Sequence, residues 1–370
     1  PKDYEGVIKE LEPSGSISEK TRYEFARKVF EQTSIYDNII ANYLLNKSKN
    51  KKTDLPDKLQ LILEKKQELR YGENPHQSGK LYSIKQPKYN GFNFNQVFGK
   101  ELSYNNLVDA ESALSCVQQF DKPTCVIVKH ANPCGVAQCN NLDNAYKNAF
   151  STDPISAFGG VIAFNKQLDN KLLNKILQKQ FVEVIVAPKF SKNYLKIIEK
   201  KPNVRLICVK ISKNQKNFDM KSLKSNFLIQ ESDNKIITKK DLKIVTNKKP
   251  SSTEINDLLF AFKVARFVKS NAIVFARDMK TLGIGAGQMS RIDSTNIAKE
   301  KAKKHKINLK NSVMASEAFF PFKDNVELAK KIGVKCIIQP GGSVKDKEII
   351  AVANKNKISM VFTGTRVFKH

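Results

Sequence analysis

The sequence predicts an α/β protein of two consecutive α/β units behind a short helical N-terminal segment. Short apolar runs typical of buried strands alternate with longer segments whose apolar residues recur at helical spacing. This alternation begins at "LRYGENPHQSG" and starts again near residue 250. Hydrophobic residues make up 41% of the 370 residues, and a chain of this size can bury two or three compact units.

The first 55 residues are expected to be helical. The segment "RYEFARKVFEQTSIYDNIIANYL" is amphipathic, and the polar stretch "NKSKNKKTDLPDK" after it is typical of a linker. The chain opens at Pro1 with neither a methionine nor a signal-like apolar stretch, which favours a piece of a longer protein.

The first α/β unit begins with a helix and a strand. Leu107, Ala110, Ala113, Leu114 and Val117 mark one helical face, and "TCVIVKH" follows as a strand. "GVIAF", "EVIVAP" and "RLICV" predict further strands. The polar region 212–249 is the expected junction to the next unit.

The second unit repeats this order. Ser251 and Glu254 form a capping-box pattern, and Ile255, Leu258, Leu259, Phe262 and Ala265 then recur at helical spacing. "NAIVFAR", "SVMAS", "CIIQP" and "SMVFTG" are the predicted strands. The sequence thus divides into residues 1–55, 56–225 and 226–370.

Composition limits the classes of function. The six cysteines mostly lie inside apolar runs, as reduced, buried thiols do, which favours the cytoplasm. No apolar run is long enough to cross a bilayer, so no membrane partner is expected. The net charge of +28 permits a basic RNA-binding protein without catalysis. The lysines are scattered among asparagines, however, and neither an RNA-binding aromatic signature nor zinc-finger spacing accompanies them. We therefore expect a solvated lysine-rich surface and no nucleic-acid partner.

The stretch "VIVKHANPCGVAQC" places a lysine and a histidine where an apolar strand meets expected turn residues. Neighbouring side chains of a strand point to opposite faces, so Lys129 and His130 can share a site only if the strand ends at Lys129. The following "ANPCG" is predicted to be the turn that ends it. On this stretch alone, a solvated lysine and a structural histidine remain the alternative.

This and related motifs partly match three chemistries. A zinc deaminase is disfavoured because Cys134 and Cys139 lack the required spacing and no H-x-E triplet is present, so no metal is expected. Dinucleotide binding is disfavoured because "TLGIGAGQMS" has GxGxG spacing, which fits a close-approach glycine turn better. Formyl or acyl transfer is possible, with His130 as the base and Lys129 as the cationic stabiliser.

Longer motifs identify a resemblance. "LRYGENPHQ", "VKHANPCGVA", "DPISAFGG", "VKSNAIV", "GIGAGQMSRIDS", "EAFFPFKDN", "QPGGSVKD" and "MVFTGTRVFKH" occur in this order. Over about residues 60–370 the chain closely resembles the transformylase domain of the AICAR transformylase/IMP cyclohydrolase family. Residues 1–55 resemble only the tail of that family's cyclohydrolase domain.

The resemblance implies transfer of a formyl group from 10-formyltetrahydrofolate to the 5-amino group of AICAR, which gives FAICAR and tetrahydrofolate. It also implies a homodimer with its sites at the subunit interface, and two cytidine-deaminase-like units without zinc. The cyclohydrolase catalytic region would precede residue 1. We therefore expect this chain not to cyclise FAICAR to IMP.

The motifs also imply the site residues. His130 resembles the proton acceptor and Lys129 the transition-state stabiliser. The positions that resemble AICAR contacts are Arg70, Tyr71, Gly159, Glu183, Asn271, Arg291, Phe319 and Arg366. Those that resemble folate contacts are Ile292, Asp324, Ser343 and Val344. The guanidinium fork of an arginine suits a phosphate.

Several of these residues have structural alternatives. Gly159 also fits a plain turn, Phe319 a core aromatic, and Arg366 an exposed charge. Asp324, three residues before Glu327, also fits a helix cap. Glu317 stands in "SEAFFPF", where aspartate is more usual in the family.

Overall fold

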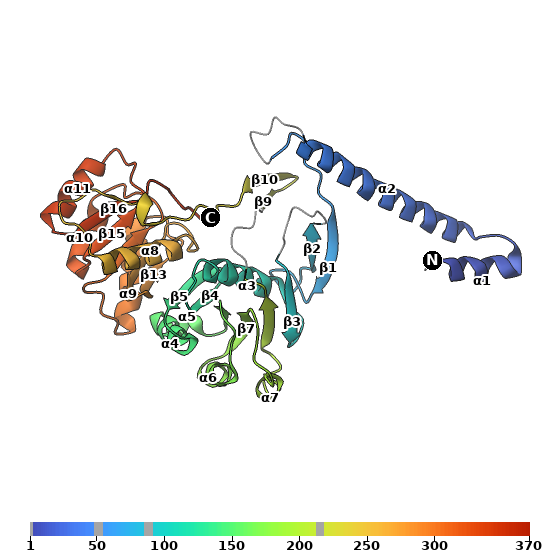
Figure 1. Cartoon of the computed structure of the whole chain (residues 1–370), viewed down its shortest axis with the longest axis horizontal. Coiled ribbons are helices and arrows are strands. Elements are labelled where there is room, and N and C mark those ends of the chain that lie inside the picture. Colours follow the sequence, from blue (N-terminus) through green and yellow to red (C-terminus); the bar gives the residue numbers. More distant parts are fainter. Residues whose placement is uncertain (1–2, 48–54, 85–91, 212–217) are drawn as a thin grey trace. The chain divides into compact units, whose positions relative to one another are not determined.

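The computed structural model describes residues 3–47, 55–84, 92–211 and 218–370 (Figure 1). It has the expected mixed α/β architecture. The chain forms two compact units: a smaller one of residues 1–66, 82–91 and 216–232, and a larger one of residues 67–81, 92–215 and 233–370. The domain boundaries expected from the sequence stay a prediction. Most of the expected linker, residues 48–54, lies outside the described residues.

The smaller unit contains the expected helical segment, as α1 (Tyr4–Ser14) and α2 (Glu19–Lys47). Large apolar side chains stay exposed along α2, among them Tyr23 at 73% and Phe30 at 75%. The same unit holds an antiparallel hairpin of β9 (Phe218–Leu223) and β10 (Asn226–Glu231). This hairpin lies in the polar region where the sequence predicted only a junction.

The strands β1 (Leu63–Leu69) and β2 (Gly79–Ile84) form a separate two-stranded sheet. In the described part of the chain, no helix combines the length and the apolar character needed to span a bilayer.

The larger unit is built on one twelve-stranded sheet in the order β11-β16-β15-β14-β12-β13-β5-β4-β6-β7-β8-β3. Its first half comprises β3 (Phe94–Phe98), β4 (Thr124–Lys129), β5 (Asn132–Gln138), β6 (Gly160–Phe164), β7 (Val182–Ala187) and β8 (Arg205–Val209). Its second half comprises β11 (Lys243–Ile244), β12 (Ile273–Arg277), β13 (Lys280–Gly285), β14 (Val313–Ser316), β15 (Cys336–Gln339) and β16 (Ser359–Phe362).

The two halves have the same strand pattern. In each, an antiparallel hairpin (β4–β5, β12–β13) is followed by an antiparallel neighbour (β6, β14) and two further parallel strands. An antiparallel edge strand, β3 or β11, completes each half. The halves join through β5 and β13, which pair antiparallel.

Helices cover both faces of this sheet. The first half carries α3 (Tyr104–Val117), α4 (Leu142–Thr152), α5 (Pro154–Ala157), α6 (Asn170–Lys179) and α7 (Leu195–Ile198). The second half carries the 3-10 turn Lys239–Asp241, α8 (Ser252–Ala265), α9 (Arg291–Lys304), α10 (Asp324–Ile332) and α11 (Asp346–Lys355). The predicted capping box at the start of α8, between Ser251 and Glu254, is confirmed.

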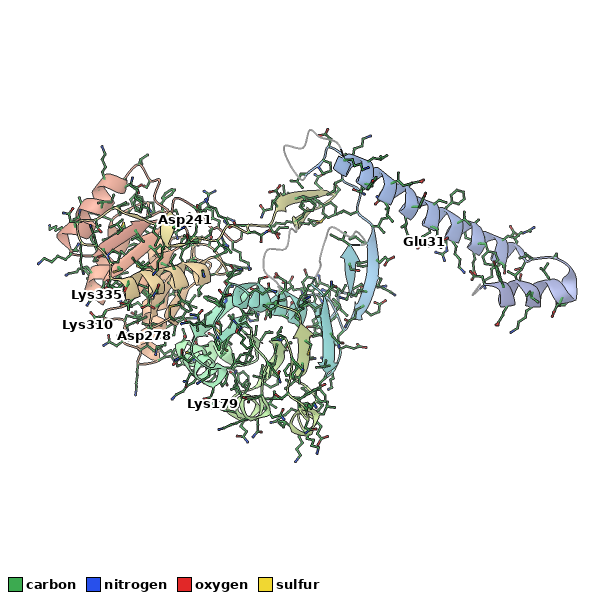
Figure 2. The ribbon with its side chains drawn as sticks, in the orientation of Figure 1. Glu31, Lys179, Asp241, Asp278, Lys310 and Lys335 are labelled. Atoms are coloured by element: carbon green, nitrogen blue, oxygen red, sulfur yellow. The ribbon has the colours of Figure 1, made fainter. Side chains whose placement is uncertain are left out.

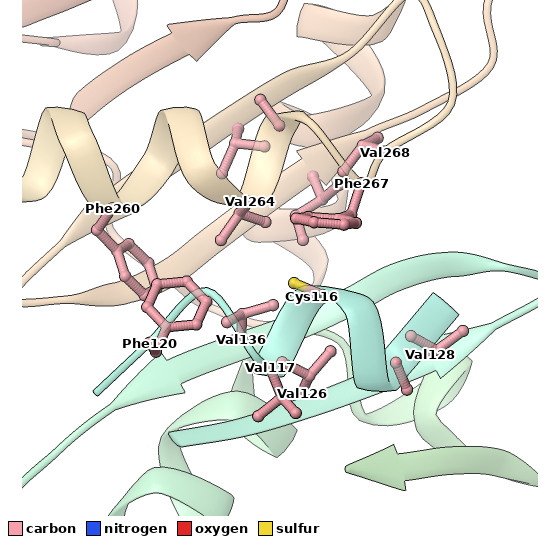
Figure 3. Close-up of a cluster of buried hydrophobic side chains, with 14 of the residues drawn as sticks. Cys116, Val117, Phe120, Val126, Val128, Val136, Phe260, Val264, Phe267 and Val268 are labelled. Carbon is pink, nitrogen blue, oxygen red and sulfur yellow. The ribbon is translucent and has the colours of Figure 1, made fainter. Parts of the chain in front are cut away.

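The largest core cluster joins the two halves. It lies where α3 and α8 cover the same face of the sheet, and the rings of Phe120 and Phe260 meet there with centroids 5.4 Å apart (Figure 3). Two further clusters fill the opposite face, one in each half. Because apolar side chains lie on both faces, the central strands are continuous apolar runs, and this explains why the sequence revealed them.

Strand directions define two ends of this sheet. We call the end at which β4 finishes the site end. The carboxyl ends of β13, β14, β15 and β16 and the amino ends of β5, β6, β7, β8 and β12 lie at the same end.

Candidate active site

Every residue that the family motifs placed in the site lies at the site end of the sheet. Lys129 closes β4, and Gly159 and Glu183 stand at the starts of β6 and β7. The second-half residues precede β12 or follow β13, β14, β15 and β16. Arg70 and Tyr71 reach the same end, because their backbones bond Leu102 and Tyr104 at the start of α3. Residues from eight separate motifs thus share one region.

Lys129 is held against the loop that precedes β6. Its Nζ donates to the carbonyl oxygen of Gly159 over 2.9 Å. Gly159 has φ +64°, and its N–H donates to Phe181 O over 2.9 Å. A Cβ at this position would lie 3.2 Å from Lys129 Nζ. Glycine at this position therefore allows both the left-handed backbone conformation and the close approach of Lys129 Nζ.

The turn after Lys129 consists of His130 and Ala131. Lys129 pairs with Asn132 across the hairpin, and the two residues between them have φ +51° and +57°. The condition for a shared site, that the strand ends at Lys129, is met. The prediction that "ANPCG" forms the turn is wrong, because Asn132 already begins β5. The left-handed pair His130–Ala131 reverses the chain.

The glycines of the two hairpins serve close packing against helices. A Cβ on Gly135 would lie 2.0 Å from Ala149 O of α4, and a Cβ on Gly285 would lie 1.9 Å from Ser294 O of α9. The predicted close-approach turn at "GIGAG" is thus partly a strand, since Gly283 and Gly285 belong to β13.

Asp109 of α3 binds the turn, and no motif had identified it. Its carboxylate accepts the N–H of Ala131 over 2.6 Å and that of His130 over 3.2 Å. Ser112 Oγ, one helical turn further, donates to Ala131 O over 3.0 Å. Burial raises the pKa of Asp109, although these backbone bonds and the charges of His130 and Lys129 oppose the shift.

A second cluster of side chains contains Glu183, Arg70 and Tyr71. Asn106 Nδ2 donates to the Glu183 carboxylate over 2.7 Å. The Arg70 guanidinium lies 5.3 Å from the centre of the Tyr71 ring. Burial lowers the pKa of the neighbouring Arg205, on which the charges of Glu183 and Arg70 also act. Asn106 and Arg205 were not predicted, and no local pattern in the sequence marks them.

In the second half, Arg291 is buried among protein groups. It bonds Glu317, donates from Nη1 to Ser316 Oγ over 2.9 Å, and donates from Nη2 to Asn271 Oδ1 over 2.8 Å. The Asn271 amide in turn donates to Gln288 O over 2.9 Å. A nucleotide phosphate at Arg291 would have to share the guanidinium with these partners.

The other predicted residues make local contacts. Phe319 is 38% exposed and Val344 is fully exposed, while Ile292 lies in the first turn of α9. Ser343 Oγ accepts the N–H of Lys345, and the guanidinium of Arg366 lies 4.4 Å from the ring centre of Phe368.

The alternative for Asp324 as a helix cap is not supported. The N-cap of α10 is Lys323, and the Asp324 carboxylate instead accepts the N–H of Asn325 over 2.7 Å.

The thiols near the hairpin are not arranged as a metal centre. Among the described residues, no group of three or more His, Cys, Asp or Glu side chains is placed to hold a metal ion. Cys134 is buried, and burial raises its pKa to about 12, so it stays a protonated thiol at neutral pH.

Two comparisons with known proteins bear on this site. The AICARFT/IMPCHase bienzyme family matches residues 1–301. The chain is also 50% identical, over 365 residues, to the bifunctional purine biosynthesis protein PurH of Buchnera aphidicola subsp. Schizaphis graminum (strain Sg). That alignment covers 96% of this chain and 69% of the relative.

Proposed function

This chain belongs to the AICARFT/IMPCHase bienzyme family, and on that premise we propose that it is a formyltransferase of purine biosynthesis. It transfers the formyl group of 10-formyltetrahydrofolate to the 5-amino group of AICAR. The products are FAICAR and tetrahydrofolate. The observation that carries the proposal is the placement of Lys129 and His130 side by side at the site end of the sheet.

The chemistry requires a base and a stabiliser of negative charge. The 5-amino nitrogen is a poor nucleophile because its lone pair is delocalised into the imidazole ring. It forms a bond to the formyl carbon as it loses a proton, the carbonyl oxygen gains negative charge, and the bond from that carbon to N10 of the folate then breaks. The amine proton goes to His130 and finally to the N10 leaving group.

Lys129 is suited to the developing oxyanion. Its ammonium has three donors, of which the bond to the neutral Gly159 carbonyl uses one. A fixed cation beside the growing negative charge lowers the barrier, and partial exclusion of water strengthens the effect. Lys129 is partly buried, whereas His130 is exposed to incoming substrate.

We assign AICAR to the first-half residues Arg70, Tyr71, Gly159 and Glu183 together with Asn271, Arg291, Phe319 and Arg366. Ile292, Asp324, Ser343 and Val344 are assigned to 10-formyltetrahydrofolate. The common placement of all these residues at the site end supports the assignment. A cytoplasmic homodimer with both halves of the site at the subunit interface belongs to the same proposal.

The test is release of tetrahydrofolate that depends on both AICAR and 10-formyltetrahydrofolate. Turnover supports the proposal; no turnover, together with tight and salt-dependent binding of RNA, favours the basic RNA-binding alternative. The lack of cyclohydrolase activity also stays a prediction, and rapid IMP formation from supplied FAICAR would contradict it. A fully active monomer in sedimentation would contradict the homodimer.

A further inference from the structure

The turn that carries His130 is unfavourable by its own sequence. Two-residue hairpin turns with positive φ at both positions favour asparagine and glycine, because other residues are strained there. His130 and Ala131 hold φ +51° and +57° without a glycine. Contacts from outside the hairpin must therefore stabilise this backbone.

Helix α3 supplies these contacts. The Asp109 carboxylate accepts both N–H groups of the turn, one on each oxygen, and Ser112 Oγ donates to the Ala131 carbonyl. Ser112 is 1% exposed, so its hydroxyl is fixed by packing. Helix α3 thus binds both N–H groups of the turn and the carbonyl group of Ala131.

The second half of the sheet contains an equivalent turn bound by an aspartate, but this turn carries neither a lysine nor a histidine. Asp278 and Met279 have φ +54° and +57°, and the Asp257 carboxylate accepts their N–H groups over 3.0 and 2.8 Å. The aspartate precedes the turn by 21 residues in both halves. Because β12 runs away from the site end, this second turn lies at the opposite end of the sheet. It serves as an internal control for what such an aspartate does to the backbone alone.

We propose that Asp109 is a positioning residue for formyl transfer: by holding the left-handed turn, it directs the His130 imidazole and the Lys129 ammonium toward the same substrate. This inference rests on the proposed function. Asp109 does not touch the reacting atoms, and it acts through the two backbone N–H groups that it binds. Catalysis is sensitive to such support because a displacement of about 1 Å in a reacting group costs roughly a hundredfold in rate.

The experiment compares Asp109→Asn with Asp257→Asn. An amide keeps the size of the side chain but turns an NH2 toward one of the two N–H groups, so one bond is lost in each variant. We expect similar losses of melting temperature in the two variants. For Asp109→Asn alone, kcat should fall by about tenfold to a hundredfold, with the KM for AICAR changed by less than about threefold. Unchanged kcat in folded Asp109→Asn protein would overturn the proposal.

A rescue variant separates positioning from a direct charge effect, since Asp109 also faces the charges of His130 and Lys129. Glycine adopts positive φ without strain, so Ala131→Gly should restore most of the lost kcat to Asp109→Asn. Failure to restore it would show that the carboxylate acts by its charge, and the positioning role would be rejected.

Two further controls complete the design. If Asp109→Asn does not fold, Ser112→Ala removes the other contact to the turn and should lower kcat severalfold, again with little change in KM; wild-type kcat in that variant would count against the proposal. Absence of turnover in the wild-type chain would instead refute the proposed function, which a loss confined to the variants does not.

Discussion

The turn at His130–Ala131 and the turn at Asp278–Met279 have the same backbone and different surroundings. Each joins two antiparallel strands, holds both residues at positive φ, and is bound by an aspartate of the preceding helix. In the first, Lys129 reaches the carbonyl of Gly159. In the second, Arg277 donates to Lys310 O over 2.6 Å, and its Nε lies 3.8 Å from the Asp278 carboxylate. Asp278 and Lys310 are labelled in Figure 2.

This difference separates the fold from the chemistry. The repeated helix and hairpin supply a rigid turn at each end of the sheet, whatever side chains the turn carries. The first turn presents a lysine and a histidine, with no acid within the turn itself. At the second turn the cation, Arg277, lies beside an acid of the turn itself, Asp278. The candidate activity therefore depends on two side chains placed on a scaffold that the chain uses twice.

Removal of the imidazole should give the largest effect. We expect His130→Ala to lower kcat by about a hundredfold or more, the usual scale for loss of a general base, while AICAR still binds. The matched variant Asp278→Ala changes the equivalent position of the other turn and should keep wild-type kcat. Steady-state kinetics on both folded proteins makes the comparison. A near-wild-type kcat in His130→Ala would return His130 to a structural role and leave the two turns equivalent.

Replacement of Lys129 by arginine should lower kcat less than the loss of the imidazole does. In Lys129→Arg the charge is retained, but a planar fork replaces a compact ammonium that bonds Gly159 O. We expect kcat to fall roughly tenfold, less than for loss of a complete oxyanion donor. The reciprocal exchange Arg277→Lys, at the matching position, should leave kcat unchanged. Equal rates for wild type and Lys129→Arg would show that charge alone matters at this position.

The strands were predictable because they are buried on both faces. Residues such as Val126, Ile127 and Val128 have no exposed surface, and their continuous apolar runs are visible without any structure. The hairpin β9–β10 was missed for the opposite reason. Its side chains are mostly exposed, so no apolar alternation marks it.

The site was predictable only in part. The family motifs identified residues that share one end of the sheet, but their contacts depend on residues far away in sequence. Neither His130 nor Ala131 is a typical turn residue, so the turn could be found only through Asp109. The equal spacing of Asp109 and Asp257 from their turns, 21 residues in each half, became visible only once the turns were placed. Nothing in the sequence indicated that the Glu317 carboxylate accepts a hydrogen bond from the Arg291 guanidinium.

Replacement of glycine by alanine at Gly159 and at Gly333 gives a further comparison of the site with a second position. Gly159 and Gly333 both have positive φ, and a Cβ on either would lie 3.2 Å from a lysine side chain, Lys129 or Lys310. We expect each alanine variant to lose about 1 kcal/mol of unfolding free energy from backbone strain. Only Gly159→Ala should also lower kcat, by severalfold, because it displaces Lys129 Nζ. An unchanged kcat in Gly159→Ala would mean that the Lys129–Gly159 contact has no part in catalysis.

The smallest expected effect is a pH dependence of stability that both halves share. Burial raises the pKa of Asp109 and of Asp257 above the ordinary value of 3.8. As pH rises from 3.8 through the raised value, the unfolded chain releases these protons first, so each aspartate contributes less to stability. The stability deficits of Asp109→Asn and Asp257→Asn should therefore shrink with rising pH, and by similar amounts, in urea unfolding between about pH 4 and pH 7.

Asp153 provides the control of opposite sign. Burial raises its pKa, but hydrogen bonds from Lys301 and Ser156 outweigh burial, so that the folded pKa lies below 3.8. Its contribution to stability is therefore fully present above 3.8 and is lost only as pH falls through the lowered value. Titration of Asp153 itself should therefore add no slope to the Asp153→Asn deficit between pH 4 and pH 7. If the deficit of either turn variant were instead to grow with pH, the carboxylate would be stabilised in its charged form. A difference between the two turn variants would show that the charges around the two aspartates, Lys129 and His130 at the first turn and Arg277 and Asp278 at the second, are not equivalent.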